Sequence, residues 1–153
     1  MSEIKLLKIT NPMWMQALAP RVVSYCEKIN SPNLTYESMM TYLTHVVQFG
    51  GDMSEFWVAF KDDAPVGFCL WCTMGMPYIG TVHCDQLHIW DKDPEISREF
   101  LKQLLKYAES KRAPFIHGLM VNSKVADHFT EMGPELGIQP IISERVELYG
   151  RRT

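Results

Sequence analysis

A chain of 153 residues is long enough to build one domain with its own hydrophobic core, and nothing in its length calls for a second domain. Hydrophobic residues make up 46% of the chain and charged residues 22%, which is ordinary for a globular protein and excludes a disordered or fibrous chain. The net charge of −3 excludes a general attraction to nucleic acid or to an anionic membrane, so neither is expected as a partner.

The sequence shows no targeting or membrane segment. Its longest apolar stretch, Ala64 to Met76, is interrupted by Pro and Gly and falls short of the roughly 20 residues that a membrane span needs. The amino terminus lacks the basic segment and apolar run of a signal peptide. The four cysteines lie in stretches that predict packed elements, which is typical of reduced thiols inside a cell. We therefore expect a cytoplasmic protein without disulfides.

The amino-terminal part predicts one strand and two helices. Ile4 to Ile9 is a short apolar run that predicts a strand. From Met13 to Ile29 the apolar residues recur at three- and four-residue steps, as in an amphipathic helix, and Pro20 should kink or restart it. Thr35 is the expected N-cap of a second helix that runs to about Phe49.

Three successive β-rich runs follow the second helix. Glu55 to Lys61 and Pro65 to Thr73 are separated by Asp62-Asp63, which predicts a hairpin. A third run, Tyr78 to Trp90, extends the hairpin to an antiparallel meander of three strands.

The carboxyl-terminal part alternates helices and strands. Ile96 to Ala108 has one apolar face and predicts a helix, and Phe115 to Val121 predicts a short buried strand. A helix capped by Asn122 or Ser123 follows and should end near Gly133-Pro134. The tail predicts two more strands, Ile138 to Ile142 and Arg145 to Tyr149. The fold class is therefore α+β, with a mixed, mostly antiparallel central sheet of about six to seven strands flanked by helices.

This order of elements, with the hairpin Phe56-Trp57-Val58-Ala59 and Pro65-Val66-Gly67-Phe68, resembles the GNAT superfamily of N-acetyltransferases over nearly the whole chain. The segment Phe100 to Ala108 is similar to the family's cofactor helix, and Asn122 to Phe129 is similar to its Asn-x-x-x-Ala segment. The resemblance implies transfer of an acyl group from acetyl-CoA or another acyl-CoA to an amine. It implies cofactor contacts at the following positions: Leu87, His88, Ile89, Trp90, Ser97, Arg98, Asn122 and Phe129.

The chain departs from the family in the loop that receives the CoA diphosphate. The family has Arg/Gln-x-x-Gly-x-Gly/Ala there, whose glycines expose backbone amides at a helix N-terminus. Between Trp90 and Arg98 this chain has no glycine, and the stretch contains Asp91, Asp93 and Glu95. The same acids also suit the dipole of a helix terminus that holds no ligand. We therefore expect weak or absent acyl-CoA binding.

The second departure concerns proton transfer. The family places a tyrosine seven residues after the helix-starting Asn, and Phe129 stands there instead, without a proton to donate. For the general base, Asp85 with His83 is the candidate, on the strand where relatives often carry a carboxylate. Alternation along a strand places His83 and Asp85 on one face and Cys84, Gln86 and His88 on the other. The same residues are also ordinary on a half-exposed strand.

The pair Cys69-x-x-Cys72 does not predict a metal site. Residues three apart on a strand point to opposite faces, and the sequence holds no second Cys-x-x-Cys.

Three functions stay open from the sequence: an N-acyltransferase with an atypical cofactor site, a non-catalytic GNAT-like binding or assembly module encoded by a phage or mobile element, and a binding protein for another small ligand. The partner of the first is an unidentified amine or protein substrate. A homodimer that pairs carboxyl-terminal strands is a further arrangement that the resemblance implies.

Overall fold

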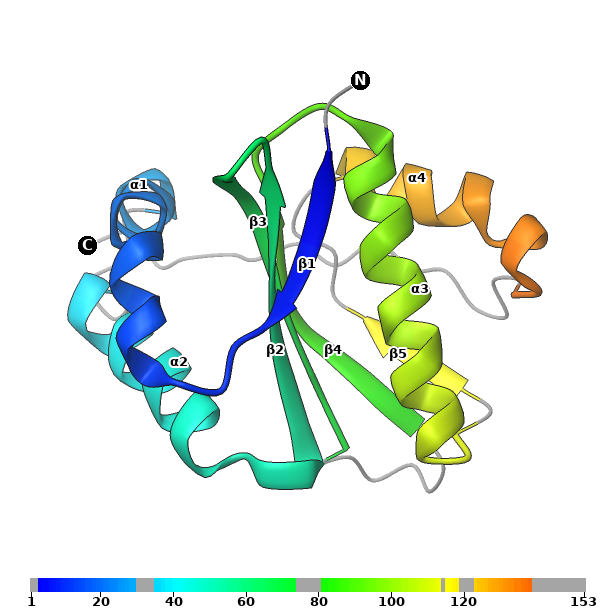
Figure 1. Cartoon of the computed structure of the whole chain (residues 1–153), viewed down its shortest axis with the longest axis horizontal. Coiled ribbons are helices and arrows are strands. Elements are labelled where there is room, and N and C mark those ends of the chain that lie inside the picture. Colours follow the sequence, from blue (N-terminus) through cyan, green and yellow to red (C-terminus); the bar gives the residue numbers. More distant parts are fainter. Residues whose placement is uncertain (1–2, 30–34, 74–80, 114, 119–122, 139–153) are drawn as a thin grey trace, which may run out of the picture.

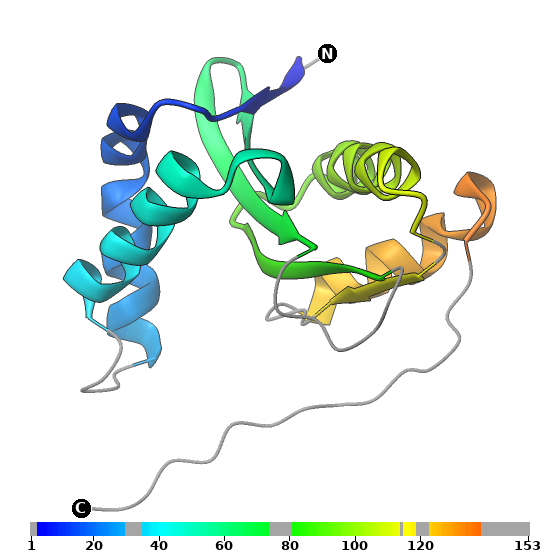
Figure 2. The ribbon, with the colours of Figure 1, turned by 90° about the horizontal axis from the view of Figure 1, so that it is seen from below.

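The structure is a computed structural model in which residues 3–29, 35–73, 81–113, 115–118 and 123–138 are described. Within these residues a five-stranded sheet lies between two pairs of helices, α1 and α2 on one face and α3 and α4 on the other (Figures 1 and 2). The strand order is β1-β2-β3-β4-β5, antiparallel from β1 to β4 and parallel between β4 and β5. The α+β class and the mostly antiparallel sheet predicted from the sequence are confirmed.

The elements keep the predicted order. The strands are β1 (Ile4–Lys8), β2 (Ser54–Lys61), β3 (Ala64–Cys72), β4 (Thr81–Ile89) and β5 (Phe115–Gly118). The helices are α1 (Ala19–Ile29), α2 (Tyr36–Phe49), α3 (Pro94–Ser110) and α4 (Ser123–Met132), with short 3-10 helices η1 (Pro12–Leu18), η2 (Gly51–Met53) and η3 (Pro134–Leu136). The strand count among the described residues is five rather than six to seven. The two strands predicted for the tail fall on residues 138–149, and only Ile138, which is not in a strand, is among the described residues.

Capping side chains set the helix boundaries. Thr35 and Ser38 form a reciprocal capping box at the start of α2, with Ser38 N–H donating to Thr35 Oγ1 at 3.1 Å. The helix predicted from Met13 to Ile29 is two elements, because Pro20 lies in the first turn of α1, where a missing N–H costs nothing. The predicted restart at this proline is therefore confirmed.

Two local features bring β2, β3 and β4 close together. Asp62 and Asp63 both adopt positive φ, 51° and 65°, as a tight two-residue hairpin turn requires. In β3, a Cβ added to Gly67 would lie 2.8 Å from the carbonyl oxygen of His88 and 3.3 Å from the ring of Phe100. Glycine therefore permits the close approach of β3 to β4 and to α3.

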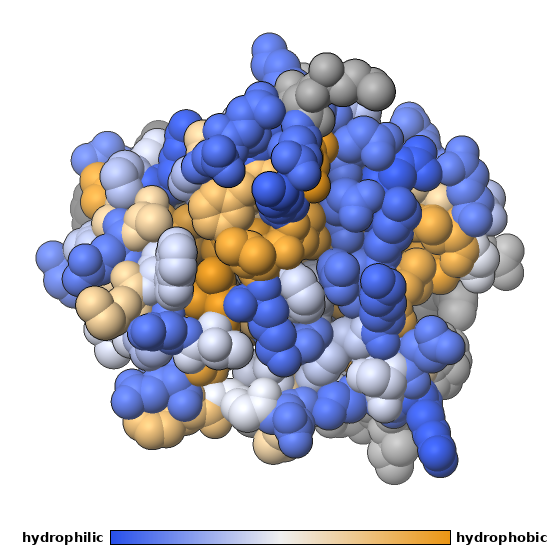
Figure 3. All heavy atoms as spheres, in the orientation of Figure 1, coloured by the Kyte–Doolittle hydropathy of each residue, from blue (hydrophilic) through white to orange (hydrophobic). Residues whose placement is uncertain are grey.

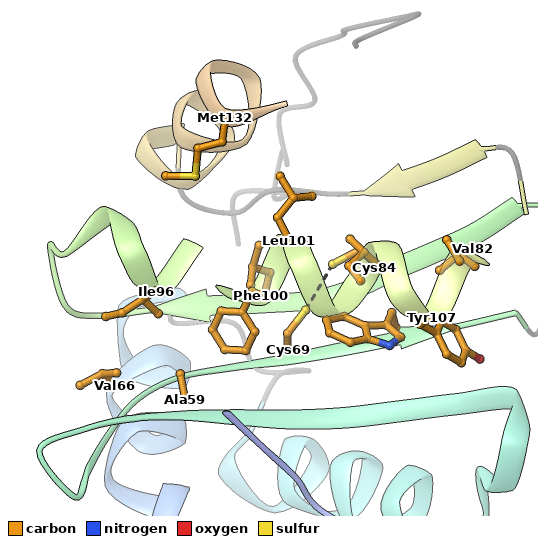
Figure 4. Packing of buried hydrophobic residues seen from close by; sticks show 14 residues of the cluster. Ala59, Val66, Cys69, Val82, Cys84, Ile96, Phe100, Leu101, Tyr107 and Met132 are labelled. Atoms are coloured by element: carbon orange, nitrogen blue, oxygen red, sulfur yellow. Dashed lines mark hydrogen bonds between the residues drawn. The ribbon is translucent and has the colours of Figure 1, made fainter. Parts of the chain in front are cut away.

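The side chains form two hydrophobic clusters, one on each face of the sheet. The α3-side core is shown in Figure 4 and contains Ala59, Val66, Cys69, Trp71, Val82, Cys84, Leu87, Ile96, Phe100, Leu101, Leu104, Tyr107, Ala108 and Met132. The α2-side core contains Ile9, Met15, Leu18, Val22, Cys26, Met39, Leu43, Phe56, Val58, Phe68 and Leu70. The outward side of α3 is hydrophilic (Figure 3). Among the described residues no helix has the length and apolar composition of a membrane span.

Candidate functional site

The site that the resemblance implies lies along β4 and at the start of α3. β4 pairs with β3 over most of its length, whereas β5 pairs with residues 81–84 of β4 only, within the part of the chain described here. The described part of β5 ends at Gly118, while β4 continues to Ile89. The crossover from β4 to its parallel neighbour β5 runs through α3, as the predicted architecture requires.

A β-bulge interrupts β4 at the candidate base. Leu70 of β3 lies opposite Gln86, and the next residue, Trp71, lies opposite Cys84, so Asp85 is the extra residue on β4. Bulges re-aim side chains and are frequent next to active sites. The bulge marks Asp85 as the irregular position of β4, where simple alternation does not apply.

The predicted distribution of β4 side chains over the two faces is therefore wrong. Cys84 lies in the α3-side core, whereas His88 stacks on Phe68 of the α2-side core, with ring centroids 4.7 Å apart. Cys84 and His88 were expected on one face, and the additional residue Asp85 reverses the alternation between them.

The four successive residues proposed as cofactor contacts, three at the end of β4 and Trp90 after it, divide between the two faces. Leu87 is buried in the α3-side core and Ile89 packs against it. His88 and Trp90 contact Phe68 of the α2-side core. These four positions therefore share a stretch of backbone rather than one side-chain surface.

His88 is held uncharged by its surroundings. Burial lowers the pKa of its imidazole from 6.5 to about 4. At neutral pH the ring is therefore a neutral donor and acceptor beneath the helices of the α2 side. His83, the other candidate on this strand, is half-buried and lies opposite Cys72 of β3.

Trp90 ties the end of β4 to the start of β3. Its backbone N–H donates to the carbonyl of Val66 at 3.0 Å, and its indole Nε1 donates to the carbonyl of Pro65 at 3.0 Å. The guanidinium of Arg21 lies 5.1 Å from the centre of the Trp90 ring, within the range of a cation–π contact. The loop that leads into α3 therefore starts from a fixed residue.

The acids of this loop are bonded within the protein. Asp93 is the N-cap of α3, and its carboxylate accepts from Glu95 N–H at 3.0 Å. The carboxylate of Asp91 accepts from Asp93 N–H at 2.9 Å, and this bond, together with the ammonium of Lys61, lowers the pKa of Asp91. Lys61 Nζ lies 3.3 Å from carboxylate oxygens of both Asp91 and Asp93. The interpretation of Asp93 as a helix-terminus residue is confirmed.

The two cofactor candidates on α3 also bond to other protein groups. Arg98 Nε donates to Glu95 at 3.1 Å and its Nη1 donates to Glu135 at 2.8 Å. Ser97 is buried, and its hydroxyl lies 3.1 Å from Nδ1 of His128 on α4. These contacts connect the first turns of α3 to α4 and η3.

On α4 the structure describes only part of the predicted site. Asn122 lies outside the described residues. Phe129 is half-buried and packs against the α3-side core, next to His128. Sequence reasoning missed His128 because no family motif points to it, and it missed Lys61 because that residue lies in β2. The antiparallel order of β2, β3 and β4 was the available signal, since it places the end of β2 near the end of β4.

These residues do not fit a diphosphate at the start of α3. The amide of Glu95 already donates to the Asp93 side chain, and the amide of Ile96 donates to the Asp93 carbonyl at 3.2 Å. Three carboxylates surround the same turn, from Asp91, Asp93 and Glu95. An anion would meet these charges and would find these two amides engaged.

Among the described residues no group of three His, Cys, Asp or Glu side chains could hold a metal ion. Cys69 lies in the α3-side core, where its sulfur is 3.5 Å from that of Cys84 (Figure 4). Cys72 is half-buried and, by alternation along β3, points to the other face. Cys69 and Cys72 therefore do not converge on one point.

No protein-family model and no curated protein matches the sequence. Solved structures match it along nearly its whole length. Aminoglycoside N-acetyltransferase AAC(6')-Iy in complex with CoA is 12% identical, with a TM-score of 0.65 over 100% of this chain and 97% of that one. Ribosomal-protein-alanine N-acetyltransferase from Brucella melitensis biovar Abortus 2308 is 17% identical, with a TM-score of 0.60 over 98% and 100%. A predicted acetyltransferase from Clostridium acetobutylicum with acetyl-CoA is 11% identical, with a TM-score of 0.65 over 97% and 96%. The chain has the GNAT fold.

Proposed function

We propose that this protein is a GNAT-like N-acyltransferase domain with an atypical acyl-CoA site, weakly active or inactive towards acetyl-CoA itself. The observation that carries the proposal is β4, which is bulged at Asp85, runs parallel to β5 and leads directly into α3. The structural neighbours that hold CoA or acetyl-CoA support an acyl thioester as the kind of donor. A mixed sheet of this kind supports many functions, so the residues of the site decide between them.

In this proposal the chain contributes a base and a binding edge. Asp85, with His83 nearby on the strand or through a water, accepts the proton of the attacking amine. The backbone from Leu87 to Trp90 holds the neutral part of the donor. Phe129 supplies no proton, so the leaving thiolate takes its proton from solvent or from a tyrosine such as Tyr78, Tyr107 or Tyr149. Of these three, Tyr107 is placed by the structure, with its hydroxyl donating to the carbonyl of Asp52 at 3.3 Å, in contact with η2 rather than with β4.

A second function is favoured by the hydrogen bonds that already engage the backbone amides at the start of α3. If the acids around Asp93 and the loss of the tyrosine together abolish turnover, the domain is a non-catalytic binding or assembly module, for which a phage or mobile-element origin is our hypothesis. A pocket for a small ligand other than CoA is the third hypothesis. The acceptor amine, a homodimer and a cytoplasmic location remain parts of these hypotheses.

Thiol release from acetyl-CoA in the presence of a panel of amines and basic peptides tests the first function. We expect slow, amine-dependent release that falls at least about tenfold in Asp85→Asn, because an amide cannot accept the proton. Asp63→Asn is the matched control, since it makes the same chemical change in the exposed β2–β3 turn. Release that is independent of the amine, or unchanged in Asp85→Asn, would favour the non-catalytic module.

A further inference from the structure

We propose that the acyl donor of this domain is a pantetheine thioester recognised without a diphosphate, so that S-acyl pantetheine is bound at least as well as acyl-CoA. This inference rests on the proposed function and names its substrate class. It starts from the finding that the residues at the start of α3 do not fit the diphosphate of CoA.

The first step concerns hydrogen-bond donors. A helix N-terminus binds an anion through amides that have no partner within the helix. Here the carboxylate of Asp93 takes the amide of Glu95, the carbonyl of Asp93 takes the amide of Ile96, and Asp91 takes the amide of Asp93. Pro94 has no amide hydrogen. Residues 93–96 therefore present no uncommitted backbone donor.

The second step concerns cations. Lys61 lies 3.3 Å from both Asp91 and Asp93, and Arg98 bonds to Glu95 and Glu135. Both cations are thus matched by more carboxylates than they can neutralise. Lys92 is the exposed cation beside them. With Arg21, whose guanidinium lies 5.1 Å from the centre of the Trp90 ring, the cations and carboxylates at this end balance. No excess of positive charge therefore offsets the carboxylates of Asp91, Asp93 and Glu95, which repel a polyanionic nucleotide at short range.

The third step concerns what the chain keeps. A pantetheine arm is uncharged, and its amides pair with a strand edge through neutral hydrogen bonds. β4 continues from the bulge at Asp85 to Ile89, past the described end of β5 at Gly118. Recognition of the arm along β4 does not depend on the charges at α3. In this proposal the arm therefore lies along β4, and the start of α3 contributes nothing to the donor's diphosphate.

The test compares S-acetylpantetheine with acetyl-CoA by calorimetry and by turnover with the same amine panel. We expect acetyl-CoA to bind no more tightly than S-acetylpantetheine. The salt dependence gives the sharper result. Lowering the salt should weaken acetyl-CoA binding and leave S-acetylpantetheine binding unchanged, because repulsion is less screened.

The variant Asp91→Asn/Asp93→Asn/Glu95→Gln keeps the acceptor atoms and an N-cap residue while removing three charges. It should raise acetyl-CoA affinity at least about tenfold and leave S-acetylpantetheine affinity unchanged. The control Glu27→Gln/Glu37→Gln/Glu109→Gln removes three exposed charges on α1, on α2 and at the far end of α3 and should change neither.

Acetyl-CoA that binds more tightly than S-acetylpantetheine, by a margin that increases as salt is lowered, would overturn the inference and leave the proposed acyltransferase function standing. Failure of both thioesters to bind or react would remove the proposed function itself, and the inference with it.

Discussion

The hydroxyl of Ser97 lies 3.1 Å from Nδ1 of His128, and this contact joins the first turns of α3 to the middle of α4. Ser97 is 1% exposed, so its hydroxyl has little access to water. We expect Ser97→Ala to lower the free energy of unfolding by about 1 kcal/mol, the usual net value of a neutral hydrogen bond. Urea denaturation of the wild type and the variant measures this difference in the free energy of unfolding.

The control for this contact is a double-mutant cycle with His128→Ala. A coupling of about 0.5 kcal/mol or more between Ser97→Ala and His128→Ala identifies the bond. Additive effects would show that the two side chains do not interact in solution.

Gly67→Ala tests the close approach of β3 to its neighbours. The new Cβ would lie 2.8 Å from the His88 carbonyl oxygen, which belongs to the backbone and cannot swing away. We expect a loss of about 1–3 kcal/mol, as for other overpacked positions, and a lower midpoint of thermal unfolding. An unchanged midpoint would mean that β3 and β4 lie farther apart at this point.

His88 predicts a pH dependence of stability. Its pKa in the folded protein, about 4, is below the ordinary 6.5 because the ring is buried, so the unfolded chain takes up the proton first as the pH falls. The contribution is complete above pH 6.5 and is lost as the pH falls from there towards 4. Between about pH 7.5 and about pH 5 the loss amounts to about 2 kcal/mol.

The variant His88→Phe, which keeps a ring beside Phe68, should lose this part of the pH dependence in urea denaturation at the two pH values. The matched change His45→Phe replaces an exposed imidazole on α2 and leaves His88 in place, so the fall in stability should persist. An equal pH dependence in wild type and His88→Phe contradicts a buried neutral imidazole.

Phe129→Tyr alone should not produce robust acetyl transfer from acetyl-CoA. A positioned general acid contributes about 10²–10⁴-fold, but the variant leaves the acids around α3 in place. The rate of thiol release with the amine panel measures the effect. Combining Phe129→Tyr with the neutralised Asp91, Asp93 and Glu95 should give a gain that neither change gives alone. Strong turnover by the single variant would show that the α3 terminus accepts CoA as it stands.

Most of the fold could be predicted because its signals are local. The apolar period of α3, the capping residue Thr35 and the Asp62-Asp63 turn each depend on a few neighbouring residues, and the structure agrees with all three. The break of the first helix at Pro20 was equally local, because proline removes an amide wherever it stands.

The site was less accessible to sequence reasoning because its decisive features are contacts between distant segments. Asp85 is in a bulge because β4 has one more residue than β3 between two paired positions. No residue type within β4 indicates that extra residue. Lys61 meets Asp91 only after β2, β3 and β4 have aligned. The sequence shows that three acids stand near the start of α3, but only the structure shows that two of them, Asp91 and Asp93, bind the same lysine.

The strand order has a consequence for how the chain folds. β2, β3 and β4 follow one another in sequence. In contrast, α1 and α2 separate β1 from its partner β2 along the chain, and α3 separates β5 from its partner β4. Closing a long loop costs more entropy than closing a hairpin, so the three-strand meander should form first and the two outer strands should join later. Pulse-labelled hydrogen exchange during refolding would show this as early protection of amides in β2 to β4 and late protection in β1, and simultaneous protection of all five strands would exclude it.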